Sequence, residues 1–297
     1  MEKIKLVINP YAGRGAGEKL APEIQRVLQE AGVAYDPVHT TGPGEMTELV
    51  RQAKEDGYEV VAIVGGDGSV FEALNGLMAA GGDDVVGTLA IIPIGTGNDF
   101  IKMLDLPADW RQACHRLAKG RPRLVDVGRC NDYYFANVVG IGFDTLVAIE
   151  ASKIKRLRGT AIYVVALFRT LLLTYATPYV KVVFDGQTVE QSITMIAVAN
   201  GRCYGGTFWI APEAEVDDGL FDLLLSRGLS RLGILYLVPH VMRGTHIDKE
   251  PVTMAKARKV VITSEEPLPV LADGEILYTN AHRLEMELFP KHLRVLV

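Results

Sequence analysis

The sequence predicts an α/β N-terminal domain built on a parallel sheet, followed by a C-terminal domain of antiparallel strands. Through the first third of the chain, short apolar runs alternate with helix-like segments, the rhythm of a parallel sheet with helices on both faces. From about Arg121 onwards, strand-like runs separated by turn residues follow one another, which is typical of an antiparallel β domain. We therefore place the domain boundary near residues 120–127.

The elements of the first domain follow from the spacing of its apolar residues. The apolar run at 4–9 is typical of a buried strand, and later strands are expected at 33–41, 59–64 and 88–95. Apolar residues at helical spacing predict helices at 18–32, 45–57, 69–81, 98–104 and 108–120. The first two of these helices end at glycine, which is a common helix stop.

The second domain is expected to be mostly strands. The strand-like segments lie at 123–129, 133–144, 179–186, 192–201, 219–226, 258–264, 267–275 and 283–289. One long helical stretch at about 144–176 interrupts them, and another helix is expected near 230–242.

Composition narrows the class of protein. A hydrophobic content of 48% over 297 residues predicts a globular protein with a full core, and a net charge of −5 argues against nucleic acid as a partner. The three cysteines lie far apart, which indicates reduced thiols and a cytoplasmic protein. The N-terminus has charges where a signal peptide needs an apolar core, and Arg169 interrupts the most apolar stretch, 160–178. We therefore expect a soluble chain.

Three glycine-rich turns each follow an expected strand of the first domain. They are NPYAGRGAG at 9–17, GGDGS at 65–69 and PIGTGNDF at 93–100. Ligands of open parallel sheets bind at the carboxyl ends of the strands, so the three turns are expected to form one crevice. A single such turn would be explained by tight packing alone, but three in succession favour a binding site.

These turns resemble the nucleotide-site motifs of the diacylglycerol kinase catalytic domain family, which includes sphingosine kinases and bacterial lipid kinases. Later segments, among them VDVGRCNDYYFANVVGIGFDT and VLADGE, are similar to that family's later motifs in the same order. The resemblance implies an ATP-binding domain like those of NAD kinase and phosphofructokinase, at 1–125, and a β-sandwich lipid-substrate domain at 126–285. It also implies that 286–297 returns to the first domain.

The sequence departs from the family pattern at a few positions. Gly205-Gly206-Thr207 stands where the family often has three glycines, and Ser69 replaces a threonine but keeps the hydroxyl. In the first loop Ala12 and Arg14 stand where a small residue and a lysine are common. Arg14 keeps the positive charge but changes its geometry.

The resemblance implies transfer of the ATP γ-phosphate to a lipid hydroxyl, with Mg²⁺. The residues that it places at the nucleotide are Asn9, Pro10, Tyr11, Ala12, Gly13, Arg14, Thr40, Gly65, Gly66, Asp67, Gly68, Ser69, Glu72, Thr96, Asn98 and Asp99. Backbone N–H groups of the glycine turns would approach the phosphates closely. Asn98 and Asp99 also suit the N-cap of the helix that follows. For each turn, the alternative is a purely structural role.

Three acids are the candidate catalytic residues. Asp67 would hold the Mg²⁺ that accompanies ATP, or would accept the proton of the lipid hydroxyl; alternatively it is only a turn residue. In an extended segment Asp273 and Glu275 would face the same side, and the resemblance makes Glu275 the candidate base and Asp273 its metal-linked neighbour. Asp126 is carried over from the family as a residue of the domain junction.

A structural Mg²⁺ is implied by the resemblance of PEAEVDDGLFDLLL to a family segment. Its ligands would be the Asp218 carboxylate and the backbone carbonyls of Glu215 and Leu220. The residues alone favour a plain Asp-Gly hairpin, with which a metal is compatible.

Membrane contact is a further expectation. Lys153, Lys155, Arg156 and Arg158 precede the apolar helix at 160–175, so this region would meet anionic headgroups and acyl chains at the inner face of the membrane. The alternative is a solvated helix end followed by a core helix.

The leading substrate is diacylglycerol, which would give phosphatidic acid. A sphingoid base, phosphatidylglycerol, NAD or a sugar are alternative acceptors, and a non-catalytic lipid-binding regulator is an alternative class. A homodimer is compatible with the sequence.

Overall fold

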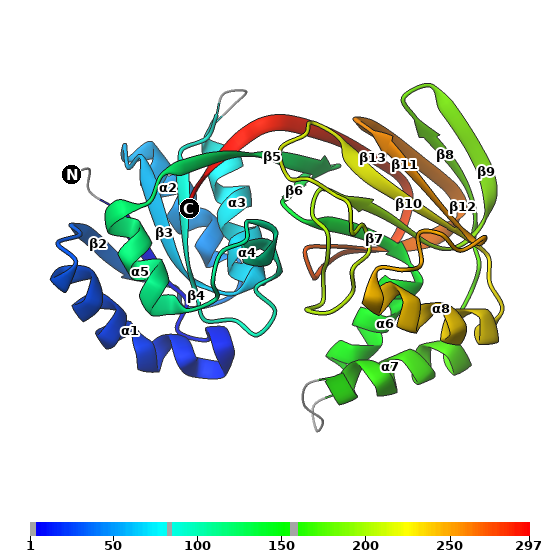
Figure 1. The fold of residues 1–297 in the computed structure, drawn as a ribbon, viewed down its shortest axis with the longest axis horizontal. Helices are drawn as coiled ribbons and strands as arrows, with labels where there is room; N and C mark the ends of the chain where they lie inside the picture. The colour runs from blue at the N-terminus through cyan, green and yellow to red at the C-terminus, as the bar shows by residue number, and fades with distance from the viewer. Residues whose placement is uncertain (1–3, 82–84, 155–159) are drawn as a thin grey trace.

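The computed structural model describes residues 4–81, 85–154 and 160–297, and its strands form one continuous network that crosses both halves of the chain (Figure 1). The main path of this sheet runs in the order β11-β10-β9-β7-β12-β13-β4-β3-β1-β2, with β5, β6 and β8 paired beside it. Of the basic residues expected to meet headgroups, Lys155, Arg156 and Arg158 lie outside the described residues.

The first half is an α/β unit whose strands pair in parallel. Its strands are β1 (Ile4–Ile8), β2 (Tyr35–His39), β3 (Val60–Gly65) and β4 (Thr88–Pro93). Its helices are α1 (Ala12–Glu30), α2 (Glu45–Glu55), α3 (Asp67–Gly81), α4 (Asp99–Met103) and α5 (Trp110–Lys119). β1 pairs in parallel with β2 and β3, and β3 pairs in parallel with β4.

The apolar strands of this unit are buried because helices cover both of their faces. One layer of core joins α1 and α5 to the sheet through residues such as Ile24 and Leu117. A second layer joins α2 and α3 to the opposite face through residues such as Val50 and Leu74. This two-sided cover is the reason that the strand segments read as continuous apolar runs.

The second half is mainly antiparallel. Its strands are β5 (Pro122–Cys130), β6 (Tyr133–Phe135), β7 (Val138–Gly142), β8 (Tyr179–Phe184), β9 (Gln187–Ala199), β10 (Phe221–Arg227), β11 (Val252–Ala257) and β12 (Lys259–Ala272). Its helices are α6 (Phe143–Ser152), α7 (Thr160–Leu173) and α8 (Arg231–Arg243), which lie together below the strands (Figure 1). Phe135 and Phe221, stacked 5.6 Å apart, centre its core.

The last strand, β13 (Glu275–Leu296), links the two halves. Its first part pairs antiparallel with β12, and its later part pairs antiparallel with β5. At its end Arg294 and Val295 pair in parallel with Thr88 and Leu89 of β4, so the C-terminal residues complete the sheet of the first half. Figure 1 shows this strand, in red, crossing from the second half to the first.

Several element boundaries differ from the sequence predictions. The single helix expected at 144–176 is wrong, because α6 ends at Ser152 and α7 begins at Thr160. The two strands expected at 258–264 and 267–275 are one strand, β12, whose register shifts take up the residues between them. β11 was not predicted; its VTMAKA sequence alternates weakly and it lies at the sheet edge.

Candidate active site

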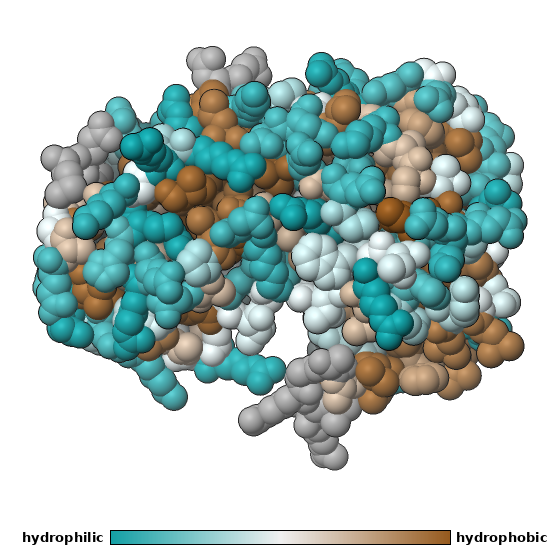
Figure 2. Space-filling model, viewed as in Figure 1, coloured by the Kyte–Doolittle hydropathy of each residue, from teal (hydrophilic) through white to brown (hydrophobic). Residues whose placement is uncertain are grey.

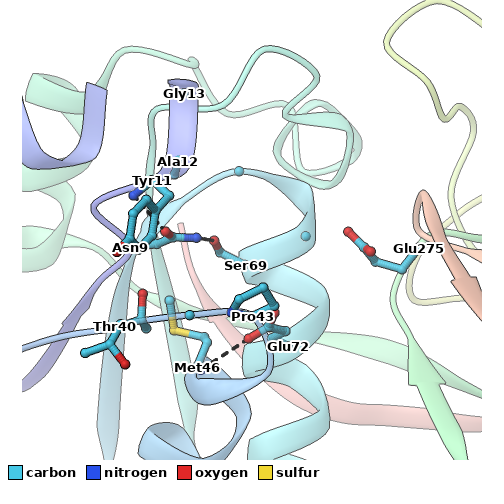
Figure 3. A pocket seen from close by; sticks show the side chains of 14 residues that line it. Asn9, Tyr11, Ala12, Gly13, Thr40, Pro43, Met46, Ser69, Glu72 and Glu275 are labelled. Carbon is cyan, nitrogen blue, oxygen red and sulfur yellow. Dashed lines mark hydrogen bonds between the residues drawn. The ribbon is translucent and has the colours of Figure 1, made fainter. Parts of the chain in front are cut away.

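One cavity of about 630 Å³ lies where the two halves meet. Most of its walls come from the turns that follow β1, β2 and β3, and one residue, Glu275, reaches it from the second half (Figure 3). The lining residues are Asn9, Tyr11, Ala12, Gly13, Thr40, Thr41, Gly42, Pro43, Met46, Gly66, Gly68, Ser69, Glu72 and Glu275. Its volume falls in the range of sites for drug-sized ligands.

The three glycine-rich turns lie against one another, as predicted from their places after successive strands. A Cβ on Gly13 would lie 2.3 Å from the carbonyl oxygen of Ile94, and one on Gly66 would lie 3.0 Å from Cα of Gly95. Only glycine permits these approaches, because a side chain at either position would collide with backbone. The expectation that all three turns form one crevice holds only in part, because the third turn packs against the other two but none of its residues lines the cavity.

The first turn has an unusual backbone. Gly13, Arg14 and Gly15 have φ of 58°, 61° and 85°, so three successive residues are left-handed before the regular part of α1. Arg14 is exposed, and neither Arg14 nor Pro10 is among the residues that line the cavity. Asn9 lies in the cavity wall, where its Nδ2 donates to Ser69 Oγ at 3.0 Å and ties the first turn to α3.

The second turn is shorter than the sequence suggested. Asp67 was interpreted as the middle of a loop, but α3 begins at Asp67, so Gly68 and Ser69 belong to its first turn. Gly65 allows Ser69 to come close, because a Cβ at position 65 would lie 2.3 Å from Ser69 Oγ. The first amides of α3 therefore face the cavity, with Gly66 and Gly68 leaving the backbone uncovered.

Asp67 turns away from the cavity lining towards α4. Its Oδ1 accepts the N–H of Asp99 at 2.6 Å and that of Phe100 at 3.5 Å. It therefore accepts the first amides of α4, whereas Asn98, predicted to be an N-cap residue, occupies the N-cap position without a side-chain cap hydrogen bond. Asn98 is left-handed at φ 51° and donates to Gly95 O instead, and Thr96 is exposed. Burial and the nearby Asp99 raise the pKa of Asp67.

Asp99 connects the first half to the second. Its Oδ2 accepts the N–H of Gly206 at 2.9 Å, and its Oδ1 lies 3.0 Å from Lys102 Nζ, which also donates to the carbonyl of Gly206. A second link runs from Asn75 on α3, which exchanges hydrogen bonds with the backbone of Tyr134 on β6. Asp99 of the third turn and Asn75 of α3 are thus each hydrogen-bonded to the second half.

Glu275 enters the cavity from the start of β13. A Cβ on Gly68 would lie 2.7 Å from Glu275 Oε1, so the carboxylate sits directly against the first turn of α3. The side chain is open to the cavity, yet the walls around it and the neighbouring Glu72 raise its pKa above the usual value. A carboxylate with a raised pKa is a better proton acceptor once it is ionised.

The prediction that Asp273 and Glu275 share one face is wrong. Asp273 and Gly274 form the two-residue turn between β12 and β13, with φ of 50° and 92°, so they are not part of an extended segment. The Asp273 carboxylate accepts the backbone N–H groups of Ala136, Asn137 and Val138 at 2.7–2.9 Å. Burial raises the pKa of Asp273 to about 6, against the opposing effect of these amides.

In the segment proposed for a structural metal, a lysine pairs with the carboxylate that was expected to bind the metal. Asp218 Oδ1 accepts the N–H of Leu220, and its Oδ2 lies 2.7 Å from Lys256 Nζ, which is also 3.3 Å from buried Asp222. Residues 217–219 join an irregular segment to β10, so the plain hairpin expected there is wrong. Asp126 accepts the N–H groups of Gly219 and Lys291 at 2.7 Å each, and thereby joins β5, this turn and β13.

The wall formed by the turn after β2 was largely missed by the sequence reading. Gly42, Pro43 and Met46 line the cavity, and the sequence gives them no motif. Glu72 holds this wall through its carboxylate, as described below. Thr40, which the resemblance places at the nucleotide, lines the cavity, and so does its neighbour Thr41.

Comparison with known proteins relates both halves of the chain to one family. Residues 3–130 match the family described as "Diacylglycerol kinase catalytic domain", and residues 137–297 match "YegS C-terminal NAD kinase beta sandwich-like domain". The sequence is 28% identical to a diacylglycerol kinase of Bacillus subtilis (strain 168) over 93% of this chain and 90% of the relative. It is 30% identical to one of Mycobacterium tuberculosis (strain CDC 1551 / Oshkosh) over 92% and 88%.

Solved structures give the same relationship. The crystal structure of a diacylglycerol kinase from Bacillus anthracis str. Sterne superposes with a TM-score of 0.77 at 28% identity, over 99% of this chain and 96% of that one. A further structure from the same organism gives a TM-score of 0.82 at 30% identity, over 99% and 94%.

Proposed function

The chain belongs to the diacylglycerol kinase family, and from that premise we propose that it transfers the γ-phosphate of ATP to the hydroxyl of diacylglycerol, giving phosphatidic acid and ADP. The observation that carries the proposal is the composition of the cavity. Glycine turns suited to phosphates form one side, and a carboxylate from the other half of the chain, Glu275, reaches the same space. Transfer of a phosphoryl group to an alcohol would need both a phosphate-binding surface and a carboxylate that can accept the proton of the alcohol.

We assign the nucleotide to the turns of the first half. The exposed backbone at Gly13, Gly66 and Gly68 and the N-terminus of α3 offer N–H groups and a partial positive charge to phosphate oxygens. Asn9 and Ser69, already hydrogen-bonded to each other, border the same surface. Pro10, Gly65, Thr96 and Asn98 would act by shaping the turns, and Arg14 would supply charge from the mouth of the site.

Mg²⁺ would enter as a partner of ATP. Among the residues that the structure describes, no group of three or more His, Cys, Asp or Glu side chains could hold a metal alone. Oxygens of Asp67 and Asp99 nevertheless converge on Gly97, where an added Cβ would lie 2.5 Å and 3.6 Å from them. Both oxygens of Asp99 are already engaged, by Lys102 Nζ and the Gly206 amide. Asp67 is therefore the carboxylate that would hold the ion together with phosphate oxygens. Bound there, the ion would neutralise phosphate charge.

A second, structural Mg²⁺ does not fit the arrangement at Asp218. Its carboxylate already has Lys256 on one oxygen and an amide on the other. We therefore assign no function to a metal held by Glu215, Asp218 and Leu220.

Glu275 is the proposed base. As the acceptor oxygen bonds to the γ-phosphorus and the bond to the β-phosphate oxygen breaks, the hydroxyl proton would pass to Glu275. Asp273 would act through the fold: by binding three amides of the segment before β7, it fixes the turn from which Glu275 projects. The two carboxylates would thus have separate tasks.

Asp67→Asn tests whether the Asp67 charge is needed. Asparagine keeps one oxygen that can accept the Asp99 amide, so the fold should survive, while the charge beside the proposed Mg²⁺ is lost. We expect kcat to fall at least about 100-fold with little change in melting temperature. Normal turnover by the variant, measured with labelled ATP, would contradict a functional role for Asp67.

Peripheral membrane contact is proposed through α7 and α8. In α7 the side chains of Phe168, Leu172 and Leu173 are 49–73% exposed, and in α8 Leu232 and Tyr236 are 78% and 61% exposed. Figure 2 shows this apolar surface at the lower right, over the two helices. The interpretation of 160–175 as a core helix is therefore wrong for most of α7. The structure has no helix, among its described residues, of sufficient length and apolarity to span a bilayer.

Charge favours an anionic lipid surface as the partner of this face. The sequences of α7 and α8 contain three arginines and no acidic residue, in a chain whose net charge is −5. We expect Leu172→Ser/Leu232→Ser to lower pelleting with phosphatidylglycerol vesicles at least about threefold. Tyr179→Ser, which removes a 54% exposed ring from β8, is the control. Equal pelleting of all three proteins, or loss of a dimer instead of lipid binding, would contradict the proposal.

A further inference from the structure

The turn after β2 forms one complete wall of the cavity. Thr40, Thr41, Gly42, Pro43 and Met46 line it, and we call residues 40–46 the β2–α2 wall. It is the least regular part of the lining, because it contains two glycines and a proline and joins a short edge strand to α2. Part of its shape is held from within, since Glu45 accepts from the N–H and the Oγ1 of Thr41, and the rest needs support from outside the wall.

Glu72, on the second turn of α3, supplies that support. Its Oε1 accepts the N–H of Gly44 at 3.0 Å, and its Oε2 accepts the N–H of Met46 at 3.2 Å. Its own carbonyl accepts from Thr47 Oγ1 at 3.0 Å. Figure 3 shows the Glu72 carboxylate beside Pro43 and turned towards the start of α2.

These contacts add a third carboxylate at the N-terminus of α2, whose first turn already contains Glu45 and Glu48. Gly44 is the N-cap of α2 and has no side chain to accept the first amides of the helix. Glu72 takes that place from another helix, and the negative charge meets the positive end of the α2 dipole. Since both carboxylate oxygens are already engaged by amides, Glu72 is arranged to hold backbone rather than a metal ion.

The cavity also has two chemically different ends. Asn9, Gly13, Gly66 and Gly68 present polar groups and bare backbone at one end, whereas Pro43 and Met46 present apolar surface in the β2–α2 wall. A nucleotide is divided in the same way, into charged phosphates and a flat base. The base fits the end that Glu72 supports.

We propose that Glu72 is a positioning residue that fixes the β2–α2 wall in the shape that receives the base of the nucleotide. This inference rests on the proposed use of ATP. It assigns Glu72 to the base and not to the phosphates or their metal ion. The ligand class whose binding depends on Glu72 is therefore nucleotides, and a bare polyphosphate should be insensitive to it.

Glu72→Gln is the test, with Glu48→Gln as the matched control. Glutamine has one acceptor oxygen, so one amide of the wall loses its partner, while Glu48 lies on α2, pairs with Arg51 and is not among the residues that line the cavity. We expect the KM for ATP to rise about tenfold in Glu72→Gln with kcat within about twofold. Inhibition by inorganic tripolyphosphate, which has no base, should change less than about twofold. Glu48→Gln should match the unaltered protein.

The outcomes separate this inference from the proposed function. If the unaltered protein does not bind ATP in calorimetry, the proposed function fails. If the unaltered protein binds ATP, two results for Glu72→Gln would overturn the inference. One is that the variant binds ATP as well as the unaltered protein does. The other is that it loses affinity for ATP and for tripolyphosphate to the same extent. Should Glu72→Gln not fold, Glu72→Asp is the second variant, because it keeps the charge on a side chain too short to reach both amides. It should still weaken the binding of ATP and leave the binding of tripolyphosphate unchanged.

Discussion

At the scale of single residues, five acids near the junction of the two halves differ in what they bind. Asp67 caps α4, Glu72 caps α2, Asp99 holds the Gly206 amide and Asp273 binds three amides. Only Glu275 has its carboxylate open to the cavity and set against the start of a helix. Backbone contacts thus leave one acid available for proton transfer.

The activity of this protein should depend on pH through Glu275. The base works only when it is ionised, and its pKa is raised, so kcat/KM should climb with pH through a limb that lies above 4.5. Glu72→Gln removes a nearby negative charge, which would lower the pKa of Glu275 and move that limb to lower pH. A pH–rate profile of both proteins measures this shift. An unmoved limb would contradict coupling between the two acids.

Asp273→Asn should destabilise the fold. The carboxylate serves three amides, whereas asparagine would turn its NH₂ group towards at least one of them and leave that donor unpaired. We expect a loss of about 1–3 kcal/mol in the free energy of unfolding. Urea denaturation followed by circular dichroism measures it. Unchanged stability together with lost activity would instead indicate that Asp273 takes part in the chemistry directly.

At the scale of elements, the fit of α3 against β13 can be tested by adding one methyl group. In Gly68→Ala the new Cβ would lie 2.7 Å from Glu275 Oε1, the mobile end of a side chain. The fold should tolerate this contact at a cost below about 1 kcal/mol, but the base would be displaced. We expect kcat to fall at least about tenfold with little change in melting temperature. Full activity would show that Glu275 need not rest against α3.

Substitution of Lys256 tests the ion pairs of the acidic residues at the start of β10. Its ammonium bridges Asp218 and buried Asp222, so Lys256→Met would leave two carboxylates without their partner. Because Lys256 is 43% exposed, we expect a modest loss of about 1–2 kcal/mol in the free energy of unfolding. Without nucleotide, millimolar Mg²⁺ should leave the melting temperature of the unaltered protein unchanged. A clear rise would instead support a metal at Asp218.

The sequence could predict the elements whose signals are local. The three glycine turns and their meeting followed from their places after β1, β3 and β4, because parallel strands end at one edge. Contacts distant in sequence were not predictable: nothing near Glu72 indicates that its partners are Gly44 and Met46. The turn at Asp273 and Gly274 does have a local signal, because an Asp-Gly pair between two strands is typical of a tight turn. The prediction of one extended strand over 267–275 left no place for that turn.

At the scale of the whole molecule, β13 is the element that makes the cavity possible. It carries Glu275 at its start, passes through the sheet of the second half and ends against β4 in the first. Hydrogen bonds of Asp99 with Gly206 and of Asn75 with Tyr134 also join the two halves. The position of Glu275 relative to the glycine turns is therefore set by the association of the two halves.

The most direct test of the account is incubation of the purified chain with γ-labelled ATP, Mg²⁺ and a panel of lipids in mixed micelles. The panel holds diacylglycerol, monoacylglycerol, a sphingoid base and phosphatidylglycerol, and Glu275→Gln is the matched inactive control. We predict labelled phosphatidic acid from diacylglycerol, lost in the variant. If no lipid is labelled in any detergent, the account of this protein as a lipid kinase is contradicted.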